Sequence, residues 1–209
     1  MVRPAQAQTP PTPLSQSRWP VRRMPRWLLL AGALVVAGGV LVALPHHPST
    51  AQRAADLRGY LKNLESGVES CAGGVSESLY AMHSITSGSS HDTKTAIGIA
   101  SYGAQNCSPA NNQSLDDLTQ YQVSESLASY RLQTAQNDVV TWAFPLAQRV
   151  QTDIAEMLTA GSATARARDV TALQRDQRAL DAERATIDGI VQPVINSLSA
   201  HASVPKLPG

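Results

Sequence analysis

Apolar residues follow two different patterns along the 209-residue chain. Trp27–Leu44 is a continuous apolar run without a charged residue or a proline, and Pro45 follows it directly. From about residue 50 onward, apolar residues instead recur three and four positions apart, with polar residues between them. A continuous run is typical of a membrane-spanning helix, whereas the spaced pattern is typical of helices that pack on one another.

The run Trp27–Leu44 has the length and composition to cross a bilayer. At about 1.5 Å per residue, its 18 residues extend about 27 Å, close to the hydrocarbon thickness of about 30 Å. Ten of these residues are Leu or Val, each of which favours insertion by roughly 0.3–0.6 kcal/mol. We therefore predict a single transmembrane helix near the shortest spanning length, which makes the lipid bilayer its first expected partner.

The residues before this run predict its orientation. Residues 1–26 are rich in Pro, Gln, Thr and Ser and contain no acidic residue, which is typical of a disordered tail. Arg22, Arg23 and Arg26 lie just before the run, and positive charge before a span favours a cytoplasmic N-terminus. We expect these arginines and Trp27 at the membrane interface, and the remainder of the chain on the extracytoplasmic side.

A cleaved secretory signal is the alternative for the same segment. Ser49 and Ala51 would be the small residues before the cut, and the protein would then be secreted. A retained anchor is favoured because the apolar run exceeds the usual length of about 7–15 residues, and because Pro45–Pro48 is unfavourable before a peptidase site.

Small residues within the predicted span raise the question of self-association. Gly32, Gly39 and Ala43 fall near one helix face, which would let two copies approach closely as a homodimer. Such residues are also frequent on faces that contact only lipid, so both interpretations stand.

Amphipathic helices are predicted after a short linker, residues 45–49. The first begins at Ser49 or Thr50 and passes Gly73–Gly74, where glycine would bend or fray it. A second follows an Asp92 cap and ends near Asn106.

The later pattern predicts longer helices with kinks. Leu115–Thr159 is predicted to be one long kinked helix or two nearly collinear ones, with Pro145 at the kink and Ser114 as a capping residue. From Thr164 the apolar residues fit a heptad frame, with a kink expected at Pro193. Charged residues of this last helix, including Asp176, are expected on its solvated face.

These patterns predict an all-α fold, an antiparallel bundle of about four helices over residues 50–200, and no strand. The last residues, 201–209, are expected to fray. The whole chain would thus comprise a cytoplasmic tail (1–26), a transmembrane helix (27–44), a linker (45–49), the bundle and the frayed end.

Cys71 and Cys107 are the two cysteines, and both lie in the part predicted to be exported. Because that environment is oxidising, we expect them to form a disulfide. The bond would join the middle of the first helix to the end of the second and would stabilise the fold by roughly 3–4 kcal/mol through loop entropy.

Composition and charge argue against several functions. The net charge is +1 and arginines lie on both sides of the apolar run, so nucleic acid is not an expected partner. Arginine is commoner than lysine and alanine is abundant, as in proteins of high-GC bacterial genomes, which favours a bacterial cell envelope. No catalytic, cofactor or metal site is predicted. His83, His91 and Asp92 are interpreted as loop residues, and Ser101 lacks the preceding strand of a hydrolase elbow.

The expected function is therefore that of a membrane-anchored, extracytoplasmic helical protein that binds another envelope protein or component, and not that of an enzyme. The alternative is a helical sensor domain that binds a small ligand and signals through a separate partner. A polar cleft lined by Tyr102, Tyr121, Tyr130 or Trp142 would favour the sensor, whereas a filled core would favour protein binding.

Overall fold

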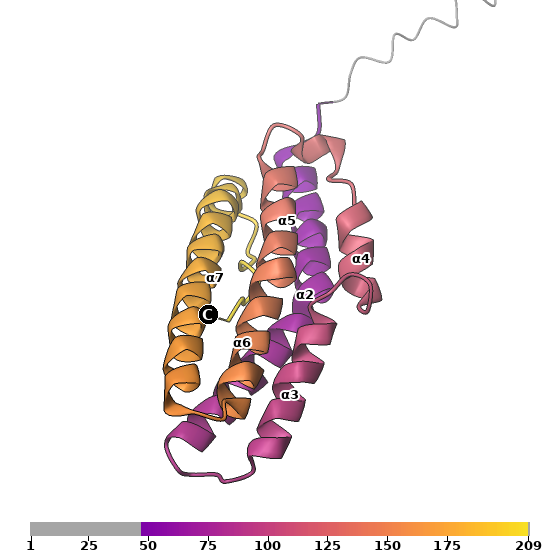
Figure 1. Ribbon diagram of the computed structural model, residues 1–209. Coiled ribbons are helices and arrows are strands. Elements are labelled where there is room, and N and C mark those ends of the chain that lie inside the picture. Colours follow the sequence, from indigo (N-terminus) through magenta and orange to yellow (C-terminus); the bar gives the residue numbers. More distant parts are fainter. Residues whose placement is uncertain (1–46, 209) are drawn as a thin grey trace, which may run out of the picture. The chain divides into compact units, whose positions relative to one another are not determined.

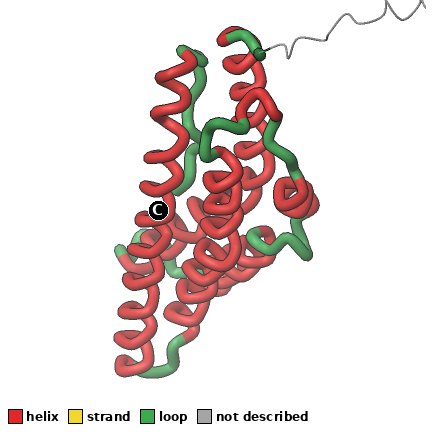
Figure 2. Tube along the Cα trace, turned by 90° about the horizontal axis from the view of Figure 1, so that it is seen from above, coloured by secondary structure: helices red, strands yellow, loops and turns green. Residues whose placement is uncertain are grey.

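Residues 47–208 are described by the computed structural model, and every regular element within this range is a helix. Figure 2 shows only helices and loops in the described part of the chain. None of these helices combines the length and the hydropathy of a membrane span. The predicted span Trp27–Leu44, its arginines and its small-residue face lie outside the described residues.

The described residues form about five helices if α5 and α6, which follow each other across η2, are counted as one, whereas the sequence predicts about four. The main helices are α2 (Thr50–Thr86), α3 (Thr93–Asn106), α4 (Gln113–Gln120), α5 (Leu132–Thr141), α6 (Gln148–Thr159) and α7 (Ala163–Leu198). Two short elements complete them: a 3₁₀ turn, η1 (Glu125–Leu127), and a π-helical stretch, η2 (Trp142–Ala147). In Figure 1, α3 runs antiparallel to α2, and α7 runs antiparallel to the stacked pair α5 and α6.

Side-chain caps explain where four of the helices begin. Each capping side chain accepts a hydrogen bond from a backbone N–H in the first turn, which satisfies one of the otherwise free donors of that turn. The caps are Ser49, Asp92, Asn112 and Ser162. Ser49 and Asp92 confirm the predicted starts, whereas the third helix is capped by Asn112 and not by Ser114.

The apolar stripe of α2 forms one side of the core. Leu57, Leu64 and Cys71 are fully buried, as the three- and four-residue spacing predicts. The helix does not fray at Gly73–Gly74 but continues to Thr86, and its direction changes along this length in Figure 1. Gly74 has a packing role, because a Cβ placed on it would lie 2.9 Å from the Cα of Gly103 in α3.

The prediction of one continuous or two collinear helices over Leu115–Thr159 is wrong in its first half. α4 ends at Gln120, Tyr121 adopts an extended conformation, and an irregular segment leads to α5. The buried side chain of Gln136 holds this break, because its Nε2 donates to the carbonyl oxygens of Leu118 and Tyr121, both at 2.8 Å. Both carbonyls lie at the end of α4, and that of Leu118 also accepts a hydrogen bond from the N–H of Tyr121 at 3.3 Å.

Pro145 interrupts the second half of this segment, as predicted. It lies in η2 between α5 and α6, where Phe144 has non-helical backbone angles (φ −134°, ψ 115°). Trp142 and Ala143 of the same stretch are fully buried, so the irregular turn is packed into the core.

The final helix differs from the prediction in two ways. α7 continues through Pro193 to Leu198 as one helix. Asp169 and Asp176 are buried on its inner side, only 6% and 5% exposed, although the charged residues were expected to be solvated. Arg168 and Arg175 neutralise them through ion pairs at 2.9 Å and 2.8 Å, which makes burial of the carboxylates tolerable.

Candidate functional site

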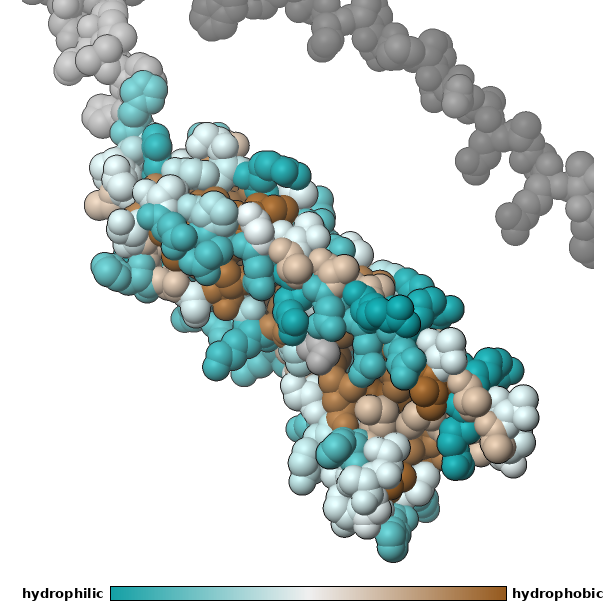
Figure 3. All heavy atoms as spheres, turned by 90° about the vertical axis from the view of Figure 1, so that its left-hand side faces the viewer, coloured by the Kyte–Doolittle hydropathy of each residue, from teal (hydrophilic) through white to brown (hydrophobic). Residues whose placement is uncertain are grey.

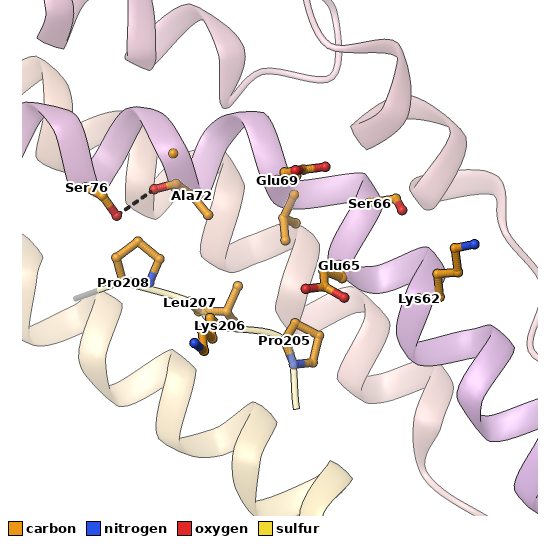
Figure 4. A pocket seen from close by; sticks show the side chains of 12 residues that line it. Lys62, Glu65, Ser66, Glu69, Ala72, Ser76, Pro205, Lys206, Leu207 and Pro208 are labelled. Atoms are coloured by element: carbon orange, nitrogen blue, oxygen red, sulfur yellow. Dashed lines mark hydrogen bonds between the residues drawn. The ribbon is translucent and has the colours of Figure 1, made fainter. Parts of the chain in front are cut away.

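An open groove of about 580 Å³ beside α2 carries both charged and apolar side chains. One wall is the exposed face of α2 between Lys62 and Ser76, and the other is the tail segment Pro205–Pro208 (Figure 4). We refer to this space as the α2–tail groove. Its volume lies within the range of about 300–1,000 Å³ that is usual for ligand sites.

The floor and the rim of the α2–tail groove differ in polarity. Val68 and Leu207 are buried and contribute apolar surface, and the partly buried Ala72 adds a methyl group between them. The rim carries the exposed charges Lys62, Glu65, Glu69 and Lys206, none of which forms an ion pair within residues 47–208. An apolar floor with a charged rim is the usual anatomy of a protein–protein contact surface.

The second wall exists because the chain reverses after α7. Ser199 adopts the left-handed conformation (φ 48°), and the N–H of Ala200 donates to the carbonyl oxygen of Ile195 at 3.1 Å. This ends the helix and turns the following residues back along the bundle. Residues 201–209 were expected to fray, but within the described part of this segment Pro205 and Leu207 are buried.

The two cysteines form the predicted pair. Cys71 in the middle of α2 and Cys107 at the end of α3 lie at disulfide-bonding distance, with their Cα atoms 4.6 Å apart. The fully buried Gln151 of α6 contacts this pair, because its Nε2 lies 2.9 Å from the Sγ of Cys107. Its Oε1 accepts a hydrogen bond from the Oγ of Ser78 at 3.2 Å. No local sequence signal distinguishes Gln151, because its polar partners come from α2 and α3.

A second group of polar side chains lies between α6 and α7. Burial, followed by the neighbouring carboxylate of Asp176, raises the pKa of Asp153 to about 6. The Arg175 guanidinium hydrogen bonds to Asp176 and lowers the pKa of that carboxyl group. The positive charge of Arg149 also lowers the pKa of Asp176, and the negative charge of Glu156 also raises the pKa of Asp153. Because these groups lie between α6 and α7, the protonation of Asp153 depends on how the two helices pack.

The aromatic residues considered for a ligand cleft do not converge. Trp142 is fully buried in the core, whereas Tyr102 is 67% exposed on α3. Tyr121 and Tyr130 are partly buried against the core near the α4–α5 connection. Tyr60, which the sequence does not single out, fills that part of the core and donates from its Oη to the carbonyl oxygen of Leu132 at 2.6 Å.

The histidine and serine candidates lie apart from the groove. His83, His91 and Ser101 are exposed, and Asp92 acts as the N-cap of α3. No group of three potential metal-ligating side chains occurs within residues 47–208.

The face on the α7 side is mostly hydrophilic, and apolar side chains are visible there only in separate patches (Figure 3). The large hydrophobic residues with the greatest exposure, Tyr80, Tyr102 and Phe144, come from three different elements. Scattered exposed residues of this kind are normal on soluble surfaces, so the α2–tail groove is the stronger candidate for a contact site.

Comparison with known proteins identifies no matching family model, no similar curated protein and no similar solved structure. The function of the groove therefore has to be argued from this chain's own residues.

Proposed function

We propose that the chain is a membrane-anchored, extracytoplasmic helical protein that binds another protein of a bacterial cell envelope through the α2–tail groove. The observation that carries the proposal is the groove itself, in whose floor the partly buried Ala72 and Pro208 leave apolar surface between rim charges that form no ion pair within residues 47–208. Desolvating such a floor stabilises a complex, and rim charges select the partner and steer its approach.

The proposed location rests on two features of different kinds. The charge-free run Trp27–Leu44 follows a tail that is basic and contains no acidic residue, which favours an anchor with an extracytoplasmic C-terminal part. The paired cysteines Cys71 and Cys107 support the same side of the membrane, because disulfides persist in oxidising compartments.

A protein partner is favoured over a small ligand by how the interior is filled. Trp142, Leu57 and Ile187 are fully buried, and the core between the helices is occupied by side chains of this kind. The α2–tail groove is open and lies on the surface along α2, where an extended or helical segment fits better than an enclosed metabolite.

Photo-crosslinking in intact membranes tests this proposal. A photoreactive benzoylphenylalanine replaces Ser76 in the groove and, as a matched control, Thr152, which is exposed on α6 and does not line the groove. We expect a cross-linked protein from position 76 and not from position 152, identified by mass spectrometry.

Equal cross-linking at both positions, or none at position 76, would contradict the proposal. A small molecule co-purifying with the protein in native mass spectra, without any cross-linked protein, would favour the sensor function. Protease added to spheroplasts serves as the orientation control, and digestion of the bundle only from the cytoplasmic side would contradict the topology.

A further inference from the structure

The C-terminal tail, residues 200–208, lies along the bundle between α2 and α7, as Figures 1 and 4 show. Ala200 is fully buried and Leu207 is 4% exposed, so the tail covers apolar surface that these two helices would otherwise expose. The tail has no regular secondary structure, and Pro205–Pro208 run alongside α2 in Figure 4. It therefore occupies this surface in the way an extended peptide ligand would.

The tail is held by few polar interactions. Within residues 47–208, no backbone–backbone hydrogen bond involves residues 201–208. The side chain of Arg184 supplies one contact, from its Nη1 to the carbonyl oxygen of Leu207 at 3.3 Å. The rest of the attachment is apolar burial of Pro205 and Leu207. Segments with few backbone hydrogen bonds open at low free-energy cost compared with core helices.

The sequence of the tail shows what chemistry the surface accepts. In Val204–Pro208, Leu207 points into the core while Lys206 is exposed beside α2. The facing wall carries Glu65 and Glu69, one helical turn apart and without an ion pair in the described residues. Two carboxylates at this spacing repel each other, so a cation between them is favourable.

We propose that the surface between α2 and α7 is a docking site for an extended peptide segment with a leucine flanked by prolines and with one cationic side chain, and that the tail is an exchangeable internal copy of this ligand. The inference rests on the proposed function, since it names the class of partner. On exchange, the partner's segment takes the place of the tail wall of the α2–tail groove and lies against the α2 wall. The tail competes because its covalent attachment gives it a high effective concentration.

Peptide binding to the full chain in detergent micelles tests the proposal. The probe is a fluorescein-labelled peptide with the sequence of residues 203–208, SVPKLP, followed by fluorescence anisotropy. The variant Leu207→Asp releases the tail, and Ser203→Asp places the same charge at an exposed tail position as the matched control. We expect Leu207→Asp to bind the peptide about tenfold or more tightly than the unaltered protein and Ser203→Asp do.

The specificity control is the same peptide with aspartate in place of its leucine, which should not bind. Equal binding by all three proteins, or no binding by a folded Leu207→Asp protein, overturns the proposal. If that outcome is accompanied by continued cross-linking at position 76, the proposed binding function stands and only the identity of the ligand fails.

Limited proteolysis of the tail decides the matter if Leu207→Asp does not fold. Arg184→Ala removes the contact to Leu207, whereas Asp181→Ala removes only the other partner of Arg184, an ion pair at 3.0 Å. We expect trypsin to cleave after the exposed Lys206 about tenfold faster in Arg184→Ala than in Asp181→Ala or the unaltered protein, with hydrogen exchange of α2 and α7 unchanged. Cleavage after Lys206 as slow in both variants as in the unaltered protein would show that the tail is a fixed part of the fold and overturn the proposal.

Discussion

The side-chain nitrogen of Gln151 lies 2.9 Å from the sulfur of Cys107, so a residue of α6 contacts the bond that joins α2 to α3. The same amide accepts a hydrogen bond from Ser78 of α2. One fully buried side chain thus connects three helices through polar contacts in an otherwise apolar region. Such groups stabilise a particular packing when they are fully satisfied and destabilise it when a partner is lost.

Replacing Gln151 with alanine should therefore destabilise the bundle. We expect a loss of about 2–4 kcal/mol, because the change leaves a cavity and removes the partner of Ser78. Thermal unfolding followed by circular dichroism measures the loss. The control Gln174→Ala, at an exposed position of α7, should change stability by less than about 0.5 kcal/mol, and equal effects of both variants would contradict this interpretation.

Removing the disulfide should lower stability by about 3–4 kcal/mol, since it closes a loop between positions 36 residues apart. The double variant Cys71→Ala/Cys107→Ala and the unaltered protein are compared by denaturant unfolding with and without reductant. Reductant should destabilise only the unaltered protein. Two reactive thiols in the native, non-reduced protein would contradict the pairing.

Two glycines of α3 should respond in opposite ways to alanine. A Cβ on Gly103 would overlap Oε1 of Gln151 and lie 3.3 Å from the Cα of Gly74, so Gly103→Ala should cost about 1–3 kcal/mol. Gly98 has no neighbouring atom within 4 Å of such a Cβ, so Gly98→Ala should stabilise by up to about 1 kcal/mol through helix propensity. Urea unfolding curves distinguish the two, and a Gly103→Ala variant as stable as the unaltered protein would argue against close α2–α3 packing.

The carboxyl pair between α6 and α7 should make stability depend on pH. The pKa of Asp153 is raised from 3.8 to about 6, so between about pH 4 and pH 6 the folded chain retains a proton that the unfolded chain has lost. Stability therefore falls as the pH rises through this window. Burial also raises the pKa of Glu183, which contributes in the same direction.

The variant Asp153→Asn should be more stable than the unaltered protein at pH 7 by about 1 kcal/mol, allowing for partial exposure, and equally stable near pH 3. Midpoints of thermal unfolding across this pH range measure the difference. The exposed Asp117→Asn serves as the control and should leave the pH profile unchanged. A profile of Asp153→Asn that parallels that of the unaltered protein would contradict the assignment.

The features that local sequence determines could be predicted. α2 and α3 begin where Ser49 and Asp92 provide caps, and the buried stripe of α2 follows its apolar spacing. Capping and periodicity act within a turn or two, so they are visible without tertiary structure. The pairing of Cys71 with Cys107 could be predicted for another reason, because the chain contains no other cysteine.

The features that depend on residues distant in the sequence could not be predicted. The end of α4 is stabilised by the side chain of Gln136, which lies in the next α-helix of the chain. No capping residue near Gln120 indicates that the helix ends there. Asp176 is buried because Arg175 neutralises it, and an arginine next to an aspartate is equally common on a solvated face.

The candidate groove illustrates the same limit on prediction. Its α2 wall consists of residues that the amphipathic pattern assigns to solvent, and its second wall is a tail that has no helical pattern. Only the reversal at Ser199 brings Leu207 against α2, and a short apolar residue near proline carries no signal of burial by itself.

The disulfide also affects how the chain would respond to proteolysis. The exposed loop between α2 and α3, residues 87–92, lies between the two cysteines in sequence, and Gly88 at its tip has a positive φ of 75°. A protease that cuts this loop would leave Cys71 on one fragment and Cys107 on the other, so the two pieces would stay covalently joined. The nicked protein would migrate as one species without reductant and as two with it, and it would retain both walls of the groove.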